Sequence, residues 1–179
     1  MAFSWKSLLT DVARGLLREG VRSLDQGQRQ GRQNRQPSRP SVSTDYPGDF
    51  TGSPQISYSP RAGETPDPGE VVWAWVPYEE DHAQGKDRPV LLLGRDGDWL
   101  IALPLTSKDH DRDAAQETSQ GRHWTDVGTG AWDPQGRPSE ARVDRIVRVA
   151  PGSVRRTGAA LDREVFDRVA DAVRERANG

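Results

Sequence analysis

The chain has 179 residues, of which 25 are Lys or Arg, 27 are Asp or Glu, three are His and none is Cys. The absence of Cys excludes disulfides and thiolate zinc sites, and with only three His few groups remain for covalent or acid–base chemistry. The charge is uneven, because residues 1–40 contain eight basic and three acidic residues whereas residues 69–179 contain 16 basic and 20 acidic ones. A mildly acidic globular part does not attract nucleic acid by its net charge, so any RNA has to bind a locally positive groove or the basic N-terminal part.

Residues 1–25 are predicted to contain an amphipathic helix, which covers Phe3–Leu24. Leucines, valines and alanines recur there at three- and four-residue spacings, and the opposite face carries Lys and Arg. This pattern is typical of a helix that docks on its own domain or on a second copy, and also of one that binds a membrane surface or another partner. Charged residues interrupt the apolar ones, so neither a secretory signal nor a membrane span is expected, and the sequence favours a cytoplasmic location.

Residues 26–68 are predicted to be a disordered linker. Large aliphatic side chains are almost missing there, and Gln, Arg, Ser, Pro and Gly dominate, so the stretch buries too little surface to offset its chain entropy. Arginines recur among glutamines in residues 28–40. They suit either a solvated linker or a basic arm that captures RNA, and the sequence does not distinguish the two.

The remaining residues, 69–179, are predicted to form one mainly β domain. Runs of aliphatic and aromatic residues separated by turn signals indicate short strands, and an amphipathic pattern near the end indicates a C-terminal helix. Such an order of elements predicts a small curled β-barrel with the helix packed against it. The expected strands are 70–76, 89–95, 99–105, 123–127 and 141–149, and the expected helix is 161–177.

An arginine and two hydroxyl side chains stand at the ends of neighbouring strands. Arg88 precedes the second strand, and Thr106 and Ser107 follow the third. A guanidinium supplies five donors and a permanent charge, and hydroxyls add short donors, which together suit an anion and above all a phosphodiester. The alternative is that Arg88 forms an ion pair with a nearby carboxylate and that Thr106 is an ordinary strand-terminal residue. The candidate partners of Arg88 are Asp87, Glu79 and Glu80.

Polar residues around this pair are candidates for substrate binding. Lys86 and Lys108 add positive charge on the two sides, and His110 is a candidate proton carrier near Thr106. The loop Asp109-His110-Asp111 suits solvation better than a divalent ion, because three adjacent loop residues do not share one face. No metal site and no cofactor are therefore expected.

Tryptophans offer a further way to bind unpaired bases. Trp132 lies in a glycine-rich loop and is a candidate stacking platform, with core packing as an equal alternative. Trp73 and Trp75 share a strand face with Val71, so we predict core or dimer packing for them.

Four segments in a fixed order resemble the PemK/MazF family of type II toxin-antitoxin toxins over residues 69–176. The resemblance implies an SH3-like barrel, a homodimer and a cognate antitoxin, and it implies cleavage of single-stranded RNA without metal. The 2′-hydroxyl would attack the adjacent phosphate and leave a 2′,3′-cyclic phosphate and a 5′-hydroxyl, with Arg88 and Thr106 as the main active-site residues. The four segments are Gly69-Glu70-Val71-Val72-Trp73, Gly85-Lys86-Asp87-Arg88-Pro89-Val90-Leu91-Leu92-Leu93, Pro104-Leu105-Thr106-Ser107 and Glu140-Ala141-Arg142-Val143-Asp144-Arg145-Ile146-Val147-Arg148-Val149.

The chain departs from the family pattern before and after the arginine strand. Ala83-Gln84-Gly85-Lys86-Asp87 stands where members often carry a glutamate followed by Gln-Gly-Gly, and Gly94 replaces a small hydroxyl residue. Asp87 is placed to orient Arg88, but its charge also lowers the local positive potential. The alternative function is therefore a barrel that binds RNA or a protein partner without catalysis.

Overall fold

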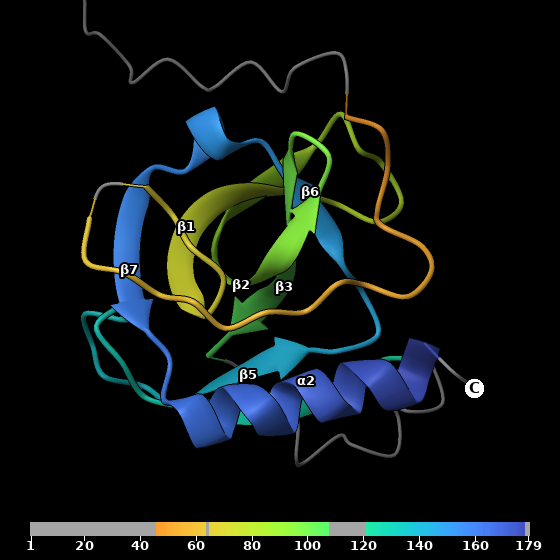
Figure 1. The fold of residues 1–179 in the computed structure, drawn as a ribbon. Coiled ribbons are helices and arrows are strands. Elements are labelled where there is room, and N and C mark those ends of the chain that lie inside the picture. Colours follow the sequence, from red (N-terminus) through yellow and green to blue (C-terminus); the bar gives the residue numbers. More distant parts are fainter. Residues whose placement is uncertain (1–45, 64, 108–120, 178–179) are drawn as a thin grey trace, which may run out of the picture. The chain divides into compact units, whose positions relative to one another are not determined.

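A curled antiparallel β-sheet forms the body of the domain, and a helix packs on one of its faces (Figure 1). The computed structural model describes residues 46–63, 65–107 and 121–177. All of them belong to a unit that spans Arg39–Gly179. The expected helix Phe3–Leu24, the arginine-rich arm, Lys108 and His110 lie outside the described residues.

Seven strands make up the sheet within the described residues. Their order is β4-β5-β3-β2-β1-β7, and β6 pairs with a different part of β3 from β5. The mainly β prediction is confirmed, and the sheet is curled as expected for the small β-barrel predicted from the sequence. The strands are β1 (Glu70–Pro77), β2 (Gly85–Asp96), β3 (Trp99–Thr106), β4 (Trp124–Gly128), β5 (Ser139–Arg142), β6 (Val147–Val149) and β7 (Arg156–Ala160).

Two strand predictions need correction. The run 141–149 is not one strand, because a turn at residues 143–144 separates β5 from β6. β7 was not predicted, since its sequence Arg-Thr-Gly-Ala-Ala has neither the run of β-branched residues nor the alternation that signals a strand. It pairs with β1 nonetheless, with Glu70 opposite Ala160.

The central strands are buried on both faces, which explains their continuous apolar sequence. Residues 90–94 of β2 are all buried, and alternate side chains enter two different apolar clusters. One cluster lies between the sheet and the C-terminal helix, and the other fills the curl of the sheet. The first includes Val71, Leu91, Leu93, Leu103 and Leu105; the second includes Val72, Val90, Leu92, Leu100, Val147 and Val149.

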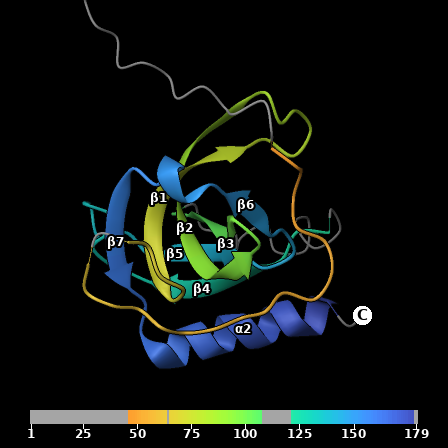
Figure 2. The same ribbon diagram turned by 45° about the horizontal axis from the view of Figure 1, so that its top comes forward.

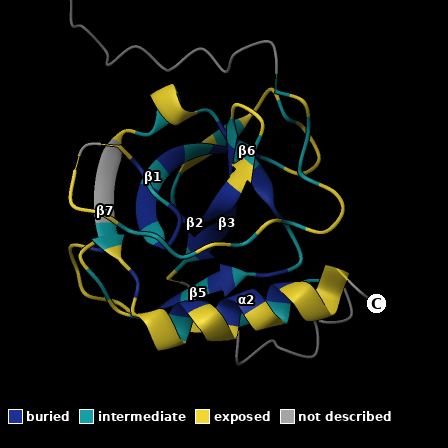
Figure 3. Ribbon diagram, in the orientation of Figure 1, coloured by how far each residue is buried: buried dark blue, intermediate teal, exposed yellow. Residues whose placement is uncertain are grey.

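The C-terminal helix α2 (Arg163–Ala177) is confirmed, with a start two residues later than predicted. Asp162 caps it, because its carboxylate accepts hydrogen bonds from the backbone N–H groups of Glu164 (2.9 Å) and Val165 (3.3 Å). Figure 3 shows the buried stripe of α2 against the sheet and the exposed stripe on its outer side. The buried residues are Phe166, Val169, Ala170 and Val173. No helix in the described ranges is long and apolar enough to cross a membrane.

Residues 46–63, here named the strap, pack on the barrel and correct the prediction of a linker over 26–68 for this part of it. Residues 26–45 of that linker lie outside the described residues. Figures 1 and 2 show the strap running beside α2 and across the sheet before it enters β1. Phe50, Ile56 and Tyr58 contact the cluster under α2, and the Tyr58 hydroxyl donates to the carbonyl of Leu161 (2.8 Å). Three anchors at irregular spacings produce no hydrophobic period, so no local pattern signals the order of this segment.

Candidate active site

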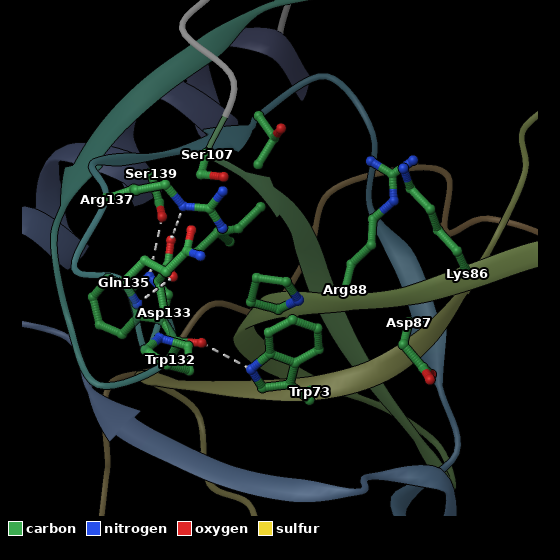
Figure 4. Close-up of a pocket in the computed structure, with 14 residues that line it drawn as sticks. Trp73, Lys86, Asp87, Arg88, Ser107, Trp132, Asp133, Gln135, Arg137 and Ser139 are labelled. Carbon is green, nitrogen blue, oxygen red and sulfur yellow. Dashed lines mark hydrogen bonds and ion pairs between the residues drawn. The ribbon is translucent and has the colours of Figure 1, made fainter. Parts of the chain in front are cut away.

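A pocket of about 430 Å³ opens at the end of the sheet where β2 begins and β3 ends (Figure 4). Its walls come from β1, from both of these strands and from the loop between β4 and β5. The structure therefore brings together five of the residues proposed from the sequence. The pocket is lined by Lys86, Arg88, Thr106, Ser107 and Trp132 from that set, and by Trp73, Asp87, Pro89, Leu105, Asp133, Pro134, Gln135, Arg137 and Ser139.

Strand pairing brings the start of β2 beside the end of β3. Val90 of β2 pairs with Pro104 of β3, and Arg88 and Thr106 each lie two residues from this pair along their strands. Successive side chains of a strand point to opposite faces. Figure 4 accordingly shows Lys86 and Arg88 projecting to one side of β2 and Asp87 to the other. Lys86 and Arg88 thus lie on the same side of β2, and Asp87 lies on the other side.

Arg88 carries an uncompensated positive charge within the part of the chain that the structure describes. Its side chain is half-buried, and its Nε atom is buried without a hydrogen-bond partner. Burial lowers the pKa of the guanidinium, the nearby Arg145 and Arg142 lower it further, and Tyr78 acts in the opposite direction. Arginine stays protonated in proteins. A buried cation without a partner is costly, so an anion that binds here recovers a large part of that cost.

The alternative of an ion pair between Arg88 and a neighbouring carboxylate is not observed among the described residues. Asp87 pairs with Arg155 instead, at 2.7 Å between Oδ2 and Nη1. Glu79 binds Arg142, at 2.8 Å between Oε2 and Nη1. These two acidic residues near Arg88 in sequence are therefore neutralised by other arginines.

Arg142 and Arg145 lie close to Arg88, and no role was predicted for them from the sequence. Burial alone would lower the pKa of Arg142, but its hydrogen bonds with Asp144 and Glu79 outweigh burial and raise it. Arg145 binds Asp49 of the strap at 2.6 Å. Both arginines are thus paired, and their effect on the unpaired Arg88 is to lower its pKa further. Because Glu79 and Asp49 are 63 and 96 residues away from their partners, no local pattern could reveal these pairs.

The two tryptophans of the pocket differ in burial. Trp132 is only 3% exposed, and its indole N–H donates to the hydroxyl of Ser139 (3.2 Å). Of the two alternatives left open for Trp132 by the sequence, this burial favours core packing over base stacking. Trp73 is half-buried and lines the pocket, and its indole N–H donates to the carbonyl of Trp132 (2.9 Å). Trp73 is therefore the better placed of the two to contact a ligand.

A buried aspartate organises the loop between β4 and β5. Asp133 is 7% exposed, and its carboxylate accepts hydrogen bonds from Nε of Arg137 (2.8 Å) and from the backbone N–H of Gln135 (2.9 Å). These two bonds, that of Arg137 foremost, lower the pKa of the Asp133 carboxyl. The loop therefore presents Arg137 to the pocket in a defined position. Neither Asp133 nor Arg137 was predicted from the sequence.

The other predicted site residues differ in exposure, and two of them are not described by the structure. Thr106 is half-buried and Ser107 is exposed at the rim. Lys108 and His110 lie outside the described residues, so their proposed roles stay predictions. Over the described ranges, no three His, Asp or Glu side chains come together as a metal site would require.

The chain is similar to a known family over most of the described domain. A family model described as PemK-like, MazF-like toxin of type II toxin-antitoxin system matches residues 67–176. Among solved structures, the crystal structure of MazE-MazF (Form-II) from Deinococcus radiodurans is similar over 62% of this chain and 94% of that chain, with 23% sequence identity and a TM-score of 0.42. The search of curated proteins gave no significant match.

Proposed function

The chain belongs to the family of PemK-like, MazF-like toxins of type II toxin-antitoxin systems, and from this premise we propose that its barrel domain is a metal-independent endoribonuclease. It cleaves single-stranded RNA by attack of a ribose 2′-hydroxyl on the adjacent phosphorus. The products are a 2′,3′-cyclic phosphate and a 5′-hydroxyl. One observation carries this proposal: the half-buried guanidinium of Arg88 has no ion-pair partner among the described residues. It lies in a pocket that also holds Thr106 and Ser107.

The chemistry asks mainly for stabilisation of charge on the phosphate. When the 2′-oxygen bonds to phosphorus and the 5′-oxygen leaves, the equatorial oxygens gain negative charge, and donors fixed in advance stabilise that state most. Arg88 supplies a fork of donors at these oxygens, and Lys86 on the same face of β2 adds a second charge. Thr106 and Ser107 donate short hydroxyl bonds from the end of β3.

A barrel that binds RNA without cleaving it is the second candidate. One observation favours it: the two carboxylates that line the pocket, Asp87 and Asp133, are both bound to arginines. Neither is thus a free general base for the 2′-hydroxyl. In this case Arg88 binds a phosphate of the RNA, but neither Asp87 nor Asp133 accepts the proton of the 2′-hydroxyl.

Partners and location follow from the toxin-antitoxin family as further proposals. We propose a cognate antitoxin protein as the regulatory partner and a homodimer as the active form, both acting in the cytoplasm. Co-expression of the toxin with its candidate antitoxin, followed by copurification and sizing by light scattering, tests the first two of these.

RNA cleavage by the full-length protein is expected to be the same with and without excess EDTA, because side chains supply the charge stabilisation. The fragment ends, identified by mass spectrometry, should be 2′,3′-cyclic phosphates and 5′-hydroxyls. Loss of activity on chelation, or 3′-hydroxyl ends, would indicate metal-assisted hydrolysis instead. RNA that is bound but left intact would support the non-catalytic barrel.

A further inference from the structure

Arg137 offers a second cationic group in the same pocket, on the wall opposite Arg88. Figure 4 draws Arg137 on the far side from Lys86 and Arg88, with Trp73 between the two sides. Its side chain is 55% exposed although its partner Asp133 is almost wholly buried. The guanidinium therefore stays accessible while one of its edges is fixed.

The contact with Asp133 uses only part of the guanidinium. Asp133 accepts from Nε at 2.8 Å, and no partner within the described part of the chain accepts from Nη1 or Nη2. A planar guanidinium has five donors in a rigid fork, so fixing the Nε edge also fixes the direction of the terminal nitrogens. These nitrogens remain available for a ligand, and the fork of a guanidinium matches the oxygens of a phosphate.

The loop that carries Arg137 is held from several sides. The Asp133 carboxylate also binds the backbone N–H of Gln135, and the Asp133 carbonyl accepts from the N–H of Gly136 at 2.9 Å. Trp132 anchors the loop in the core through its bond to Ser139. The position of Arg137 is thus prepared before a ligand arrives, which lowers the entropic cost of binding.

The simpler explanation of this ion pair is that it braces the loop. That role fits the buried Asp133, but it uses only the Nε edge of a guanidinium whose side chain is 55% exposed. The backbone bonds to Asp133 already close the loop without Arg137. A pocket of about 430 Å³ also exceeds what one phosphate fills and falls in the size range of small-ligand sites.

We propose that Arg137 binds a second phosphate of the RNA strand, next to the one at Arg88, and that Asp133 is the residue that positions it. The site then recognises a strand of at least two phosphates, which crosses the pocket over Trp73. This inference rests on the proposed function, because it assigns the substrate's neighbouring phosphate to the same pocket.

The test measures binding separately from cleavage. The probe is a fluorescent single-stranded deoxyoligonucleotide, which has phosphates but no 2′-hydroxyl and so cannot be cut by this chemistry. Its affinity for full-length wild type, Arg137→Gln and Asp133→Asn is measured by anisotropy over a series of salt concentrations. Arg174→Gln is the matched control, since Arg174 also pairs with an aspartate but lies on the exposed side of α2.

For Arg137→Gln we expect the slope of log Kobs against log[salt] to become less negative by about 0.7, because each phosphate that a protein neutralises on a single strand adds that amount to the slope. Asp133→Asn should weaken binding in the same direction, with circular dichroism showing the fold intact. Arg174→Gln should leave the slope unchanged. A nucleoside 3′-monophosphate should bind wild type and Arg137→Gln equally, because one phosphate at Arg88 does not need the second site.

An unchanged slope in Arg137→Gln overturns the proposal, as does wild type that does not bind the probe. An equal slope change in Arg174→Gln would also overturn it, because the effect would then be one of overall charge. Failure of the proposed function looks different: wild type binds the probe through Arg137 but leaves RNA intact. Probe binding therefore tests the second phosphate site, and RNA cleavage tests the proposed function.

Discussion

Replacing Arg88 by alanine is expected to reduce RNA cleavage by about 10³-fold or more while the melting temperature of the protein stays the same or rises. The loss is large because the guanidinium supplies fixed donors to oxygens that gain charge in the transition state. Stability should not fall, since Arg88 has no ion pair in the described residues and its lowered pKa means that folding destabilises the charged form. Single-turnover cleavage and thermal unfolding of the same samples measure both effects.

Two companion variants decide what the Arg88 result means. Arg95→Ala removes the same charge from an exposed position on the same strand, outside the pocket, and should leave cleavage unchanged. Arg88→Lys keeps the charge but loses the planar fork, so it should recover only a small part of the activity. A fall in melting temperature in Arg88→Ala that accounts for the missing activity would show that the arginine is structural.

Much of the barrel was predictable because its strands obey local rules. The buried runs of β1, β2 and β3 are long and apolar, and α2 shows a clear helical period, so each was found within a few residues. β7 was missed because a Gly- and Ala-rich edge strand owes its conformation to pairing with β1. Sequence patterns reveal a strand through the side chains that it buries, and the Gly and Ala residues of β7 have almost no side chain to bury.

The candidate site was predictable only where neighbouring strands carry it. Arg88, Thr106 and Ser107 stand at the ends of adjacent strands, and antiparallel pairing is sufficient to bring such ends together. Arg142 and Arg137 were missed for a different reason. Their roles depend on carboxylates that are reached through the tertiary fold or buried by it, and no spacing in the sequence encodes that burial.

Gly94 departs from the family pattern, and the fold gives a physical reason for a glycine at this position. From the sequence it was only a glycine at a position where a small hydroxyl residue is common. In the structure, β2 has an irregular register between Leu92 and Gly94, and the strap passes directly over it. A Cβ atom at position 94 would lie 2.2 Å from the backbone oxygen of Gln55. Glycine is thus the residue that lets the strap approach the strand.

Gly94→Ala is therefore expected to destabilise the protein by roughly 1–3 kcal/mol, the usual cost of overpacking a site that cannot yield freely. The obstacle is a backbone atom, so relief requires the strap to move away from β2. That movement weakens the neighbouring hydrogen bond from the N–H of Ser57 to the carbonyl of Leu93 (2.9 Å) and the packing of Ile56 and Tyr58. Urea unfolding gives the change in free energy, and limited proteolysis should show faster cleavage within residues 46–63.

The matched control for this variant is Gly63→Ala, because a Cβ atom there meets nothing within 4 Å. Its free energy of unfolding should stay within about 0.5 kcal/mol of wild type, as for most surface substitutions. Equal stability of the two variants would mean that the strap does not lie on β2 as described, and the barrel would then begin at β1. A selective loss of stability in Gly94→Ala instead makes the strap part of the folded domain, so that a truncation at residue 68 removes core packing and is not a neutral trimming of a linker.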